Sequence, residues 1–170
     1  MAENTMQDST TRNLSITRVI SAPVEEVWKA WNESDRVMQW WGPTGFTCPV
    51  ARMDVRVGGV SLVCMRAPKE WGGQDMYNTW TYTLVEQPQR LEYILHFSDA
   101  DGNVIDPATQ NLPPGMPGEV PHVVTFKSLD DNRTEVTITE YGYTSDQMVE
   151  LSRAGMNQCF DKMEAMFAGK

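Results

Sequence analysis

The longest periodic stretch of the sequence lies near its C-terminal end, between Ser145 and Phe167. Apolar and small residues recur in it at steps of three and four, the spacing that places side chains on one face of an α-helix. The residues with this spacing are Met148, Ser152, Gly155, Met156, Cys159, Met163, Met166 and Phe167. Such a helix is roughly 33 Å long at about 1.5 Å per residue, the span of a small domain. The sequence therefore predicts one long helix around which the rest of the chain folds.

The predicted inner face of this helix has an unusual composition. It is made largely of Met, and it carries Ser152 and Gly155 where a packed core would place larger side chains. Methionine adapts its shape to its surroundings, and small residues leave room beside it. Two interpretations fit this pattern: the core face of a helix that lies on a sheet, or a face that lines a cavity. The sequence leaves both open.

The charge balance restricts the partners of the chain. It has 14 Lys and Arg against 23 Asp and Glu, a formal net charge of −9 over 170 residues. Nucleic acids and anionic membrane surfaces are bound by basic patches, so we predict neither as a partner. No apolar run reaches the roughly 20 residues of a membrane-spanning helix, and the first residues lack the pattern of a signal peptide. We expect a cytoplasmic protein with a flexible tail over residues 1–12 and one domain over residues 13–170.

The first part of the domain predicts a strand followed by two short helices. Leu14 to Ile20 alternates between the two sides of a strand. Pro23 suits the first turn of a helix, and apolar residues at helical spacing continue from there to Trp31. Ser34 is placed to cap a second short helix, which Gly42 and Pro43 would end.

The chain between the two helical regions predicts six strands, rich in β-branched and aromatic residues and separated by turn residues. They are Phe46 to Val57, Val60 to Arg66, Met76 to Val85, Leu91 to Phe97, His122 to Leu129 and Thr134 to Tyr143. Short connections predict an antiparallel meander, except for the Pro-rich stretch from Ser98 to Pro121, which has the length of a lid, a binding loop or a disordered segment. The order predicts an α+β helix-grip fold, in which a curved antiparallel sheet wraps around the long C-terminal helix.

Three motifs in this order resemble a known superfamily. They are the run from Ile20 to Trp31, the run from Trp40 to Pro43 with Phe46 to Pro49 after it, and the run from Met53 to Gly59. Their sequence and spacing resemble the START-like (SRPBCC) superfamily over roughly residues 14 to 167. The most similar branch is named after the activator of the heat-shock chaperone ATPase, the AHSA-type domain.

This resemblance implies the helix-grip fold and a hydrophobic cavity between the sheet and the last helix, but no single chemistry. Members bind lipids, polyketides, hormones or a chaperone, and some are cyclases or hydrolases, so the function has to be argued from the site. Many relatives carry a Trp-Glu-Gly-Leu type motif early in the last helix. This chain has Met148 to Met156 in the corresponding region, which suggests a roomier cavity.

The predicted cavity wall combines apolar side chains with a few polar groups, the composition of a small-molecule pocket. The residues that we expect to bind a ligand are Trp41, Met65, Met76, Trp80, Tyr82, Phe97, His122, Val124, Tyr141, Met148, Leu151, Ser152, Gly155, Met156, Cys159 and Met163. The strand residues in this set depend on register, because a shift of one residue turns every side chain to the opposite face. For Trp41 the alternative is a structural role, in which its indole ring closes one end of the sheet over the core.

Three residues are candidates for acid–base catalysis: His96, His122 and Glu140. Each lies in an apolar strand, where burial can tune a group for proton transfer. The alternatives are histidines that face water or their neighbours, and an ion pair between Glu140 and an exposed basic residue. The two histidines lie on different strands with no Cys or carboxylate at ligand spacing, so we predict no metal and no cofactor.

Three functions are consistent with these patterns. The first is binding of a hydrophobic or aromatic small molecule between the sheet and the C-terminal helix. The second is a cyclase or hydrolase that uses the same cavity, with a histidine as acid or base. The third, suggested by the family name, is regulation of a chaperone ATPase. The sequence leaves open whether the protein is an enzyme and whether it forms a homodimer.

Overall fold

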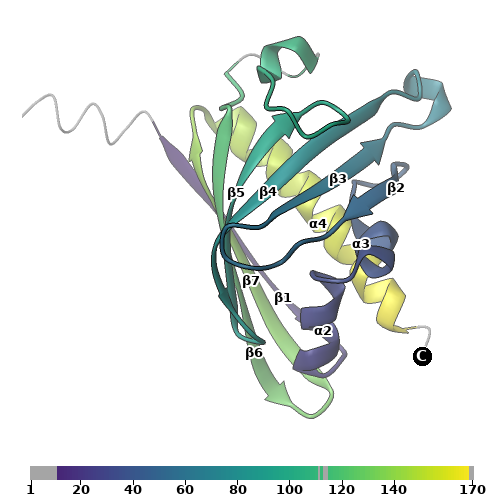
Figure 1. Cartoon of the computed structure of the whole chain (residues 1–170). Helices are drawn as coiled ribbons and strands as arrows, with labels where there is room; N and C mark the ends of the chain where they lie inside the picture. Colours follow the sequence, from purple (N-terminus) through teal and green to yellow (C-terminus); the bar gives the residue numbers. More distant parts are fainter. Residues whose placement is uncertain (1–10, 111, 113–114, 169–170) are drawn as a thin grey trace, which may run out of the picture.

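The computed structural model describes residues 11–110, 112 and 115–168. Within them the chain forms one antiparallel sheet of seven strands in the order β1-β7-β6-β5-β4-β3-β2 (Figure 1). The strands are β1 (Arg12–Ile20), β2 (Thr47–Arg52), β3 (Val60–Arg66), β4 (Asp75–Glu86), β5 (Arg90–Ser98), β6 (Glu119–Asp130) and β7 (Arg133–Tyr143). The helices are α2 (Val24–Ala30), α3 (Ser34–Trp40) and α4 (Asp146–Ala168), with short 3-10 helices η1 (Lys69–Trp71) and η2 (Pro107–Gln110).

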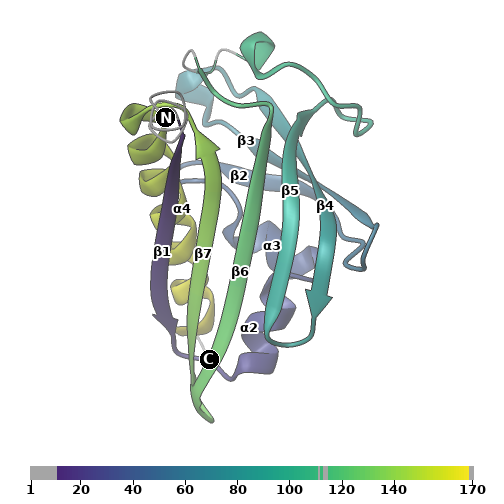
Figure 2. The ribbon, with the colours of Figure 1, turned by 90° about the vertical axis from the view of Figure 1, so that its left-hand side faces the viewer.

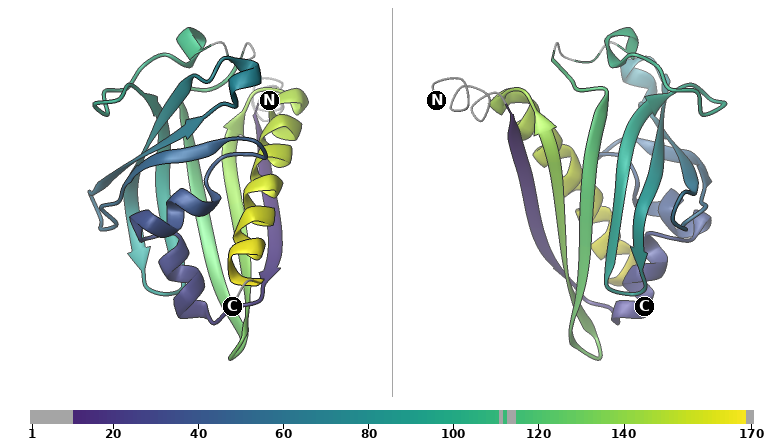
Figure 3. Two further views of the ribbon diagram at one scale, coloured as in Figure 1. Left: turned by 90° about the vertical axis from the view of Figure 1, so that its right-hand side faces the viewer. Right: turned by 60° about the vertical axis from the view of Figure 1, so that its left-hand side comes forward.

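The three α-helices share one face of the sheet. In Figure 2 strands β1, β7, β6, β5 and β4 lie in front of α2, α3 and α4, and Figure 3 shows the sheet curving around α4 from two further sides. The long helix packs against β1, β7 and α3. This arrangement confirms the predicted helix-grip fold.

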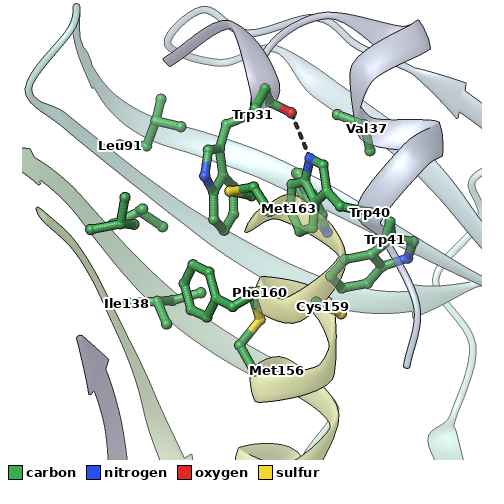
Figure 4. Packing of buried hydrophobic residues seen from close by; sticks show 14 of the residues in the cluster. Trp31, Val37, Trp40, Trp41, Leu91, Ile138, Met156, Cys159, Phe160 and Met163 are labelled. Carbon is green, nitrogen blue, oxygen red and sulfur yellow. Dashed lines mark hydrogen bonds between the residues drawn. The ribbon is translucent and has the colours of Figure 1, made fainter. Parts of the chain in front are cut away.

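The two short helices are fixed to each other through tryptophan. The indole N–H of Trp40 donates a hydrogen bond of 2.8 Å to the carbonyl of Ala30 (Figure 4). The rings of Trp31 and Trp40 lie 4.6 Å apart. Helix α3 begins at Ser34, and the residue in the capping position is Glu33, so the prediction of Ser34 as the cap was wrong by one position.

The C-terminal half of α4 lies over a closed core. Figure 4 shows Phe160 and Met163 of α4 pointing toward Trp31 and toward Leu91 and Ile138 of the sheet. The side chains of Phe160, Met163 and Trp31 are fully buried. Burial of a side chain such as Phe or Met contributes about 1.5–3 kcal/mol, so these residues stabilise the packing of α4 on the sheet.

The Pro-rich connection is shorter than the sequence predicted, because β6 already begins at Glu119. Pro121 lies inside β6 and pairs with Ile94 of β5, while the pairing of β6 with β7 starts only at His122. A proline is tolerated in a strand where one neighbour is missing. Strands β6 and β7 are therefore unpaired on the N-terminal side of His122, where Glu119 to Pro121 pair only with β5. In the described part of the chain, no helix combines the length and the apolar character needed to cross a membrane.

Candidate functional site

A cavity of about 450 Å³ lies between the N-terminal half of α4 and the sheet. Strands β3 to β7 form its floor. The residues of α4 that form its other wall are Leu151, Ser152, Ala154, Gly155, Met156, Gln158 and Cys159. Trp71 of η1 and Leu151 also line it, and their side chains are 64% and 47% exposed, so the cavity reaches the molecular surface between them. Its volume is typical of small-molecule sites.

The space under α4 follows from small residues in the helix. Ser152 and Gly155 both line the cavity. A Cβ atom added at Gly155 would meet no atom within 4 Å, so this position faces open space. Around it the wall is apolar and includes Met65, Met76 and Met156. One end of α4 thus covers a cavity, whereas the other covers a closed core.

Three polar side chains of the cavity wall form a chain of contacts. The hydroxyl of Tyr143 donates a hydrogen bond to Oε1 of Glu140. Oε2 of Glu140 lies 3.7 Å from Nε2 of His122. On the other side of the ring, Nδ1 of His122 lies 2.8 Å from the carbonyl oxygen of Val120. Because a carbonyl only accepts, Nδ1 carries a proton, and Nε2 is the nitrogen that faces Glu140.

This cluster is removed from water. His122 and Glu140 are 6% and 5% exposed. Burial raises the pKa of Tyr143 well above its ordinary value, and the adjacent Glu140 carboxylate raises this pKa further. Burial also raises the pKa of the Cys159 thiol on the facing helix to about 12. Tyr143 and Cys159 therefore keep their protons at neutral pH, and the tyrosine acts as a hydrogen-bond donor.

A bulge in β7 brings Glu140 and Tyr143 to the same face of the sheet. The pairing of β7 with β1 shifts register between Glu140 and Tyr143. Between them, Gly142 has a φ of +94°, in the left-handed region that glycine adopts readily. Such a bulge changes the alternation of the strand, so Tyr143 points inward again next to Glu140. Tyr141 points outward and is 37% exposed.

The comparisons with known proteins agree with this architecture. Residues 21–168 match the family described as Activator of Hsp90 ATPase homolog 1-like protein. The chain belongs to this family. It is an AHSA-type domain of the START-like superfamily. No match was found among curated proteins.

Solved structures show the same fold as this AHSA-type domain. A protein from Mycobacterium smegmatis has a TM-score of 0.71 and 24% identity, over 94% of this chain and 91% of its own. A protein from Chromobacterium violaceum has a TM-score of 0.73 and 25% identity, over 91% and 95% of the two chains. An AHSA1-like protein from Aeromonas hydrophila has a TM-score of 0.66 and 25% identity, over 91% and 94%.

Ten of the residues predicted for the cavity of this AHSA-type domain lie on its wall. They are Trp41, Met65, Met76, Phe97, His122, Leu151, Ser152, Gly155, Met156 and Cys159. Their contact with a ligand stays a prediction. Both strands and helix contribute, so the structure brings together residues that are up to 118 positions apart, from Trp41 to Cys159.

Six predicted residues lie elsewhere. Trp80, Tyr82, Val124, Met148 and Met163 are buried in the core, and Tyr141 points outward. The hydroxyl of Tyr82, for example, is hydrogen-bonded to Ser61 at 2.8 Å. These five residues point into the interior, as predicted. They lie in the closely packed core and do not border the cavity. For Tyr141 the predicted orientation was wrong, because Val136, Ile138 and Glu140 face inward and the regular alternation of β7 turns Tyr141 to the opposite face.

His96 does not belong to the site. Its neighbours in β5, Leu95 and Phe97, line the cavity, so His96 points to the opposite face of the sheet. There its Nε2 lies 2.9 Å from Oε2 of Glu119. Glu140, in contrast, contacts Tyr143 and His122 inside the cavity. The alternative considered from the sequence, an ion pair with an exposed basic residue, was wrong.

Four polar residues of the wall were missed by the sequence interpretation: Asn78, Tyr93, Tyr143 and Gln158. The ring of Tyr93 stacks on Trp80 at 5.0 Å on one side and on His122 at 4.9 Å on the other. The alternation of Leu91, Tyr93 and Leu95 in β5 was the signal that could have identified it. Nothing in the sequence distinguishes Asn78 from an exposed strand residue.

The described residues offer no set of ligands for a metal ion. No group of three or more His, Cys, Asp or Glu side chains lies close enough together in this part of the chain. The three cysteines are buried and free, and burial raises the pKa of each thiol. The cavity wall combines apolar side chains with the cluster formed by His122, Glu140 and Tyr143.

Proposed function

We propose that this AHSA-type domain binds a hydrophobic or aromatic small molecule in the cavity between α4 and the sheet. The observation that carries the proposal is the open space at Gly155, where the helix approaches a largely apolar wall without filling it. A closed core would place a large side chain here, as it does at Met163 two turns later. Mostly apolar cavities with a few placed polar groups are typical ligand sites.

The substitution Gly155→Leu tests this function. Leucine would extend from an unobstructed Cβ into the cavity, and it favours a helix over glycine by about 0.8 kcal/mol, so the fold should persist. We expect the affinity for the neutral fluorescent probe N-phenylnaphthylamine to fall by about tenfold or more, or about 1.4 kcal/mol. The measurement is a fluorescence titration, with circular dichroism to verify the fold.

The matched control is Gln147→Leu, an exposed position in the first turn of the same helix. It adds the same side chain outside the cavity, and the affinity for the probe should stay unchanged. Equal affinities of the original protein and the Gly155→Leu variant would contradict the proposal.

The contact between His122 and Glu140 favours a second candidate, an acid–base enzyme that works on the bound molecule. A buried histidine whose second nitrogen faces a carboxylate has the arrangement of a general base or acid. Removal of such a group lowers a rate by about 10²–10⁴-fold. Hydrolysis of a neutral aryl ester should then be lost with His122→Ala and retained with His96→Ala, the histidine on the opposite face. Equal rates in the two variants would exclude this candidate.

Regulation of a chaperone ATPase comes from the family name alone and stays a prediction. The ATPase rate of Hsp90 with and without the protein is the measurement that addresses it.

A further inference from the structure

We infer that the cavity selects an uncharged aromatic molecule that carries a hydrogen-bonding group, and that it discriminates against carboxylates and other ions. The inference rests on the proposed function and specifies the chemical class of its ligand. It is argued from the charges of the wall, from two buried polar side chains, and from the rings and sulfur atoms that surround the space.

The wall offers no counter-charge to an anion. None of its described residues is a Lys or an Arg. The ionic groups nearest to a ligand are Glu140 and His122, and each is already engaged: Glu140 with Tyr143 and His122, and His122 with the carbonyl of Val120. A buried charge without a partner loses its hydration and gains nothing in return. A carboxylate ligand in this cavity would be such a buried charge without a partner.

A cation meets a similar obstacle. Both oxygens of Glu140, the carboxylate of the wall, already face a partner, since Oε1 accepts from Tyr143 and Oε2 faces His122. Each oxygen can accept a further hydrogen bond, but an ammonium group would exchange its full hydration shell for this one carboxylate in a largely apolar cavity, and it would compete there with Tyr143 and His122. The charge inventory therefore favours an uncharged ligand.

Two polar strand side chains of the wall face the cavity without a hydrogen-bond partner among the described residues. Asn78 and Tyr93 are each 2% exposed and line the cavity. The side-chain amide of Asn78 and the hydroxyl of Tyr93 have no hydrogen bond to the described residues, and the buried indole N–H of Trp41 on the same wall has no partner there either. Buried polar groups in folded proteins nearly always have a partner. A ligand hydroxyl, carbonyl or amide would supply one.

The apolar part of the wall suits an aromatic ring. The side chains of Met65, Met76 and Met156 border the space with Trp41 and Phe97. Thioether sulfur makes favourable contacts with aromatic rings, and aromatic side chains pack on them face to face or edge to face. Methionine also adjusts to the outline of a planar ligand. An extended acyl chain would gain none of these ring-specific contacts.

The experiment uses four naphthalene derivatives substituted at the same ring carbon: naphthol, methylnaphthalene, naphthoate and naphthylmethylamine. Their affinities are measured at neutral pH by quenching of tryptophan fluorescence, since Trp41 lies on the wall. We expect naphthol to bind at least about tenfold more tightly than naphthoate, and severalfold more tightly than methylnaphthalene. Naphthylmethylamine, the cationic analogue, should bind more weakly than naphthol.

Two substitutions test the polar contacts. Asn78→Leu and Tyr93→Phe remove the groups without a partner, so the preference for naphthol over methylnaphthalene should disappear. The melting temperature should stay the same or rise, because a buried polar group without a partner is removed. Tyr82→Phe is the matched control: its hydroxyl is bonded to Ser61, so it should lower the melting temperature and keep the preference.

The outcomes separate this inference from the proposed function. If naphthoate or the amine binds as tightly as naphthol, the inference is overturned while ligand binding stands. If Asn78→Leu and Tyr93→Phe keep the preference for naphthol, or destabilise the protein as Tyr82→Phe does, the two groups are structural and the inference is also overturned. If none of the probes binds, both the inference and the proposed function are wrong.

Discussion

At the scale of single residues, Gly142 determines which side chains of β7 reach the cavity. Its φ of +94° allows the bulge that turns Tyr143 inward beside Glu140. A Cβ at this position would meet no atom within 4 Å, so the only cost of a side chain is the backbone conformation. This glycine therefore connects a local backbone feature with the polar cluster of the site.

The substitution Gly142→Ala should destabilise the protein by about 1–2 kcal/mol, because alanine is strained in the left-handed region. Urea denaturation measures this difference. Gly118→Ala is the matched control, since a Cβ there also meets nothing within 4 Å and the backbone lies outside the left-handed region. If both variants lose the same free energy of unfolding, the left-handed backbone at Gly142 carries no specific cost for alanine, and the prediction is wrong.

Three buried tyrosines predict an alkaline limit of stability. Burial raises the pKa of Tyr82, Tyr93 and Tyr143 well above 10, so the folded state holds these protons more tightly than the unfolded state does. Their contribution to stability is fully present below pH of about 10 and is lost as the pH rises above it. Tyrosinate absorbance should thus increase together with the loss of near-ultraviolet circular dichroism. Ionisation of all five tyrosines in the folded protein would contradict this.

The residues of the site show what the sequence could and could not indicate. Gly155 and Ser152 were identified because small residues interrupt an apolar helix face. Glu140 was placed in the right strand, but its pairing with Tyr143 depends on the bulge at Gly142, which a regular alternation does not predict. Asn78 was missed because its polar type is usual on an exposed strand face, and its burial follows only from the tertiary fold.

At the scale of elements, α4 combines two different surfaces on one helix. Its C-terminal half packs Phe160 and Met163 into the closed core, and its N-terminal half covers the cavity with Ser152, Gly155 and Met156. The predicted span, Ser145 to Phe167, differs from the observed Asp146–Ala168 by one residue at each end. The helical period of the apolar residues was sufficient to predict the bounds of α4. It could not show where along the helix the core ends and the cavity begins.

Truncation of side chains on α4 should reveal these two surfaces. Met163→Ala removes a fully buried side chain from the core and should cost about 2–5 kcal/mol of unfolding free energy. Leu151→Ala changes a side chain at the mouth of the cavity that is already half exposed, so its cost should stay below about 1 kcal/mol. Chemical denaturation gives both values. Similar losses for the two variants would be inconsistent with a helix that is half core and half cavity wall.

At the scale of the whole molecule, the fold divides the interior into a tryptophan-rich core near α2 and α3 and a cavity at the other end of α4. The element order and the three motifs were enough to predict the helix-grip fold, because each strand and helix carries its own period. The position of the cavity was only partly predictable. Core residues such as Trp80 and Met163 share the inward orientation of the wall residues, and only packing separates the two groups.

The central claim, a ligand bound between α4 and the sheet, is tested most directly by nuclear Overhauser effects between naphthol and the ¹³C-labelled methyl groups of methionine. The account predicts contacts with Met65, Met76 and Met156 on the cavity wall, and none with Met163 in the core or with Met38, which is 41% exposed on α3. Contacts with Met38 alone, or with no methionine of the wall, would contradict it.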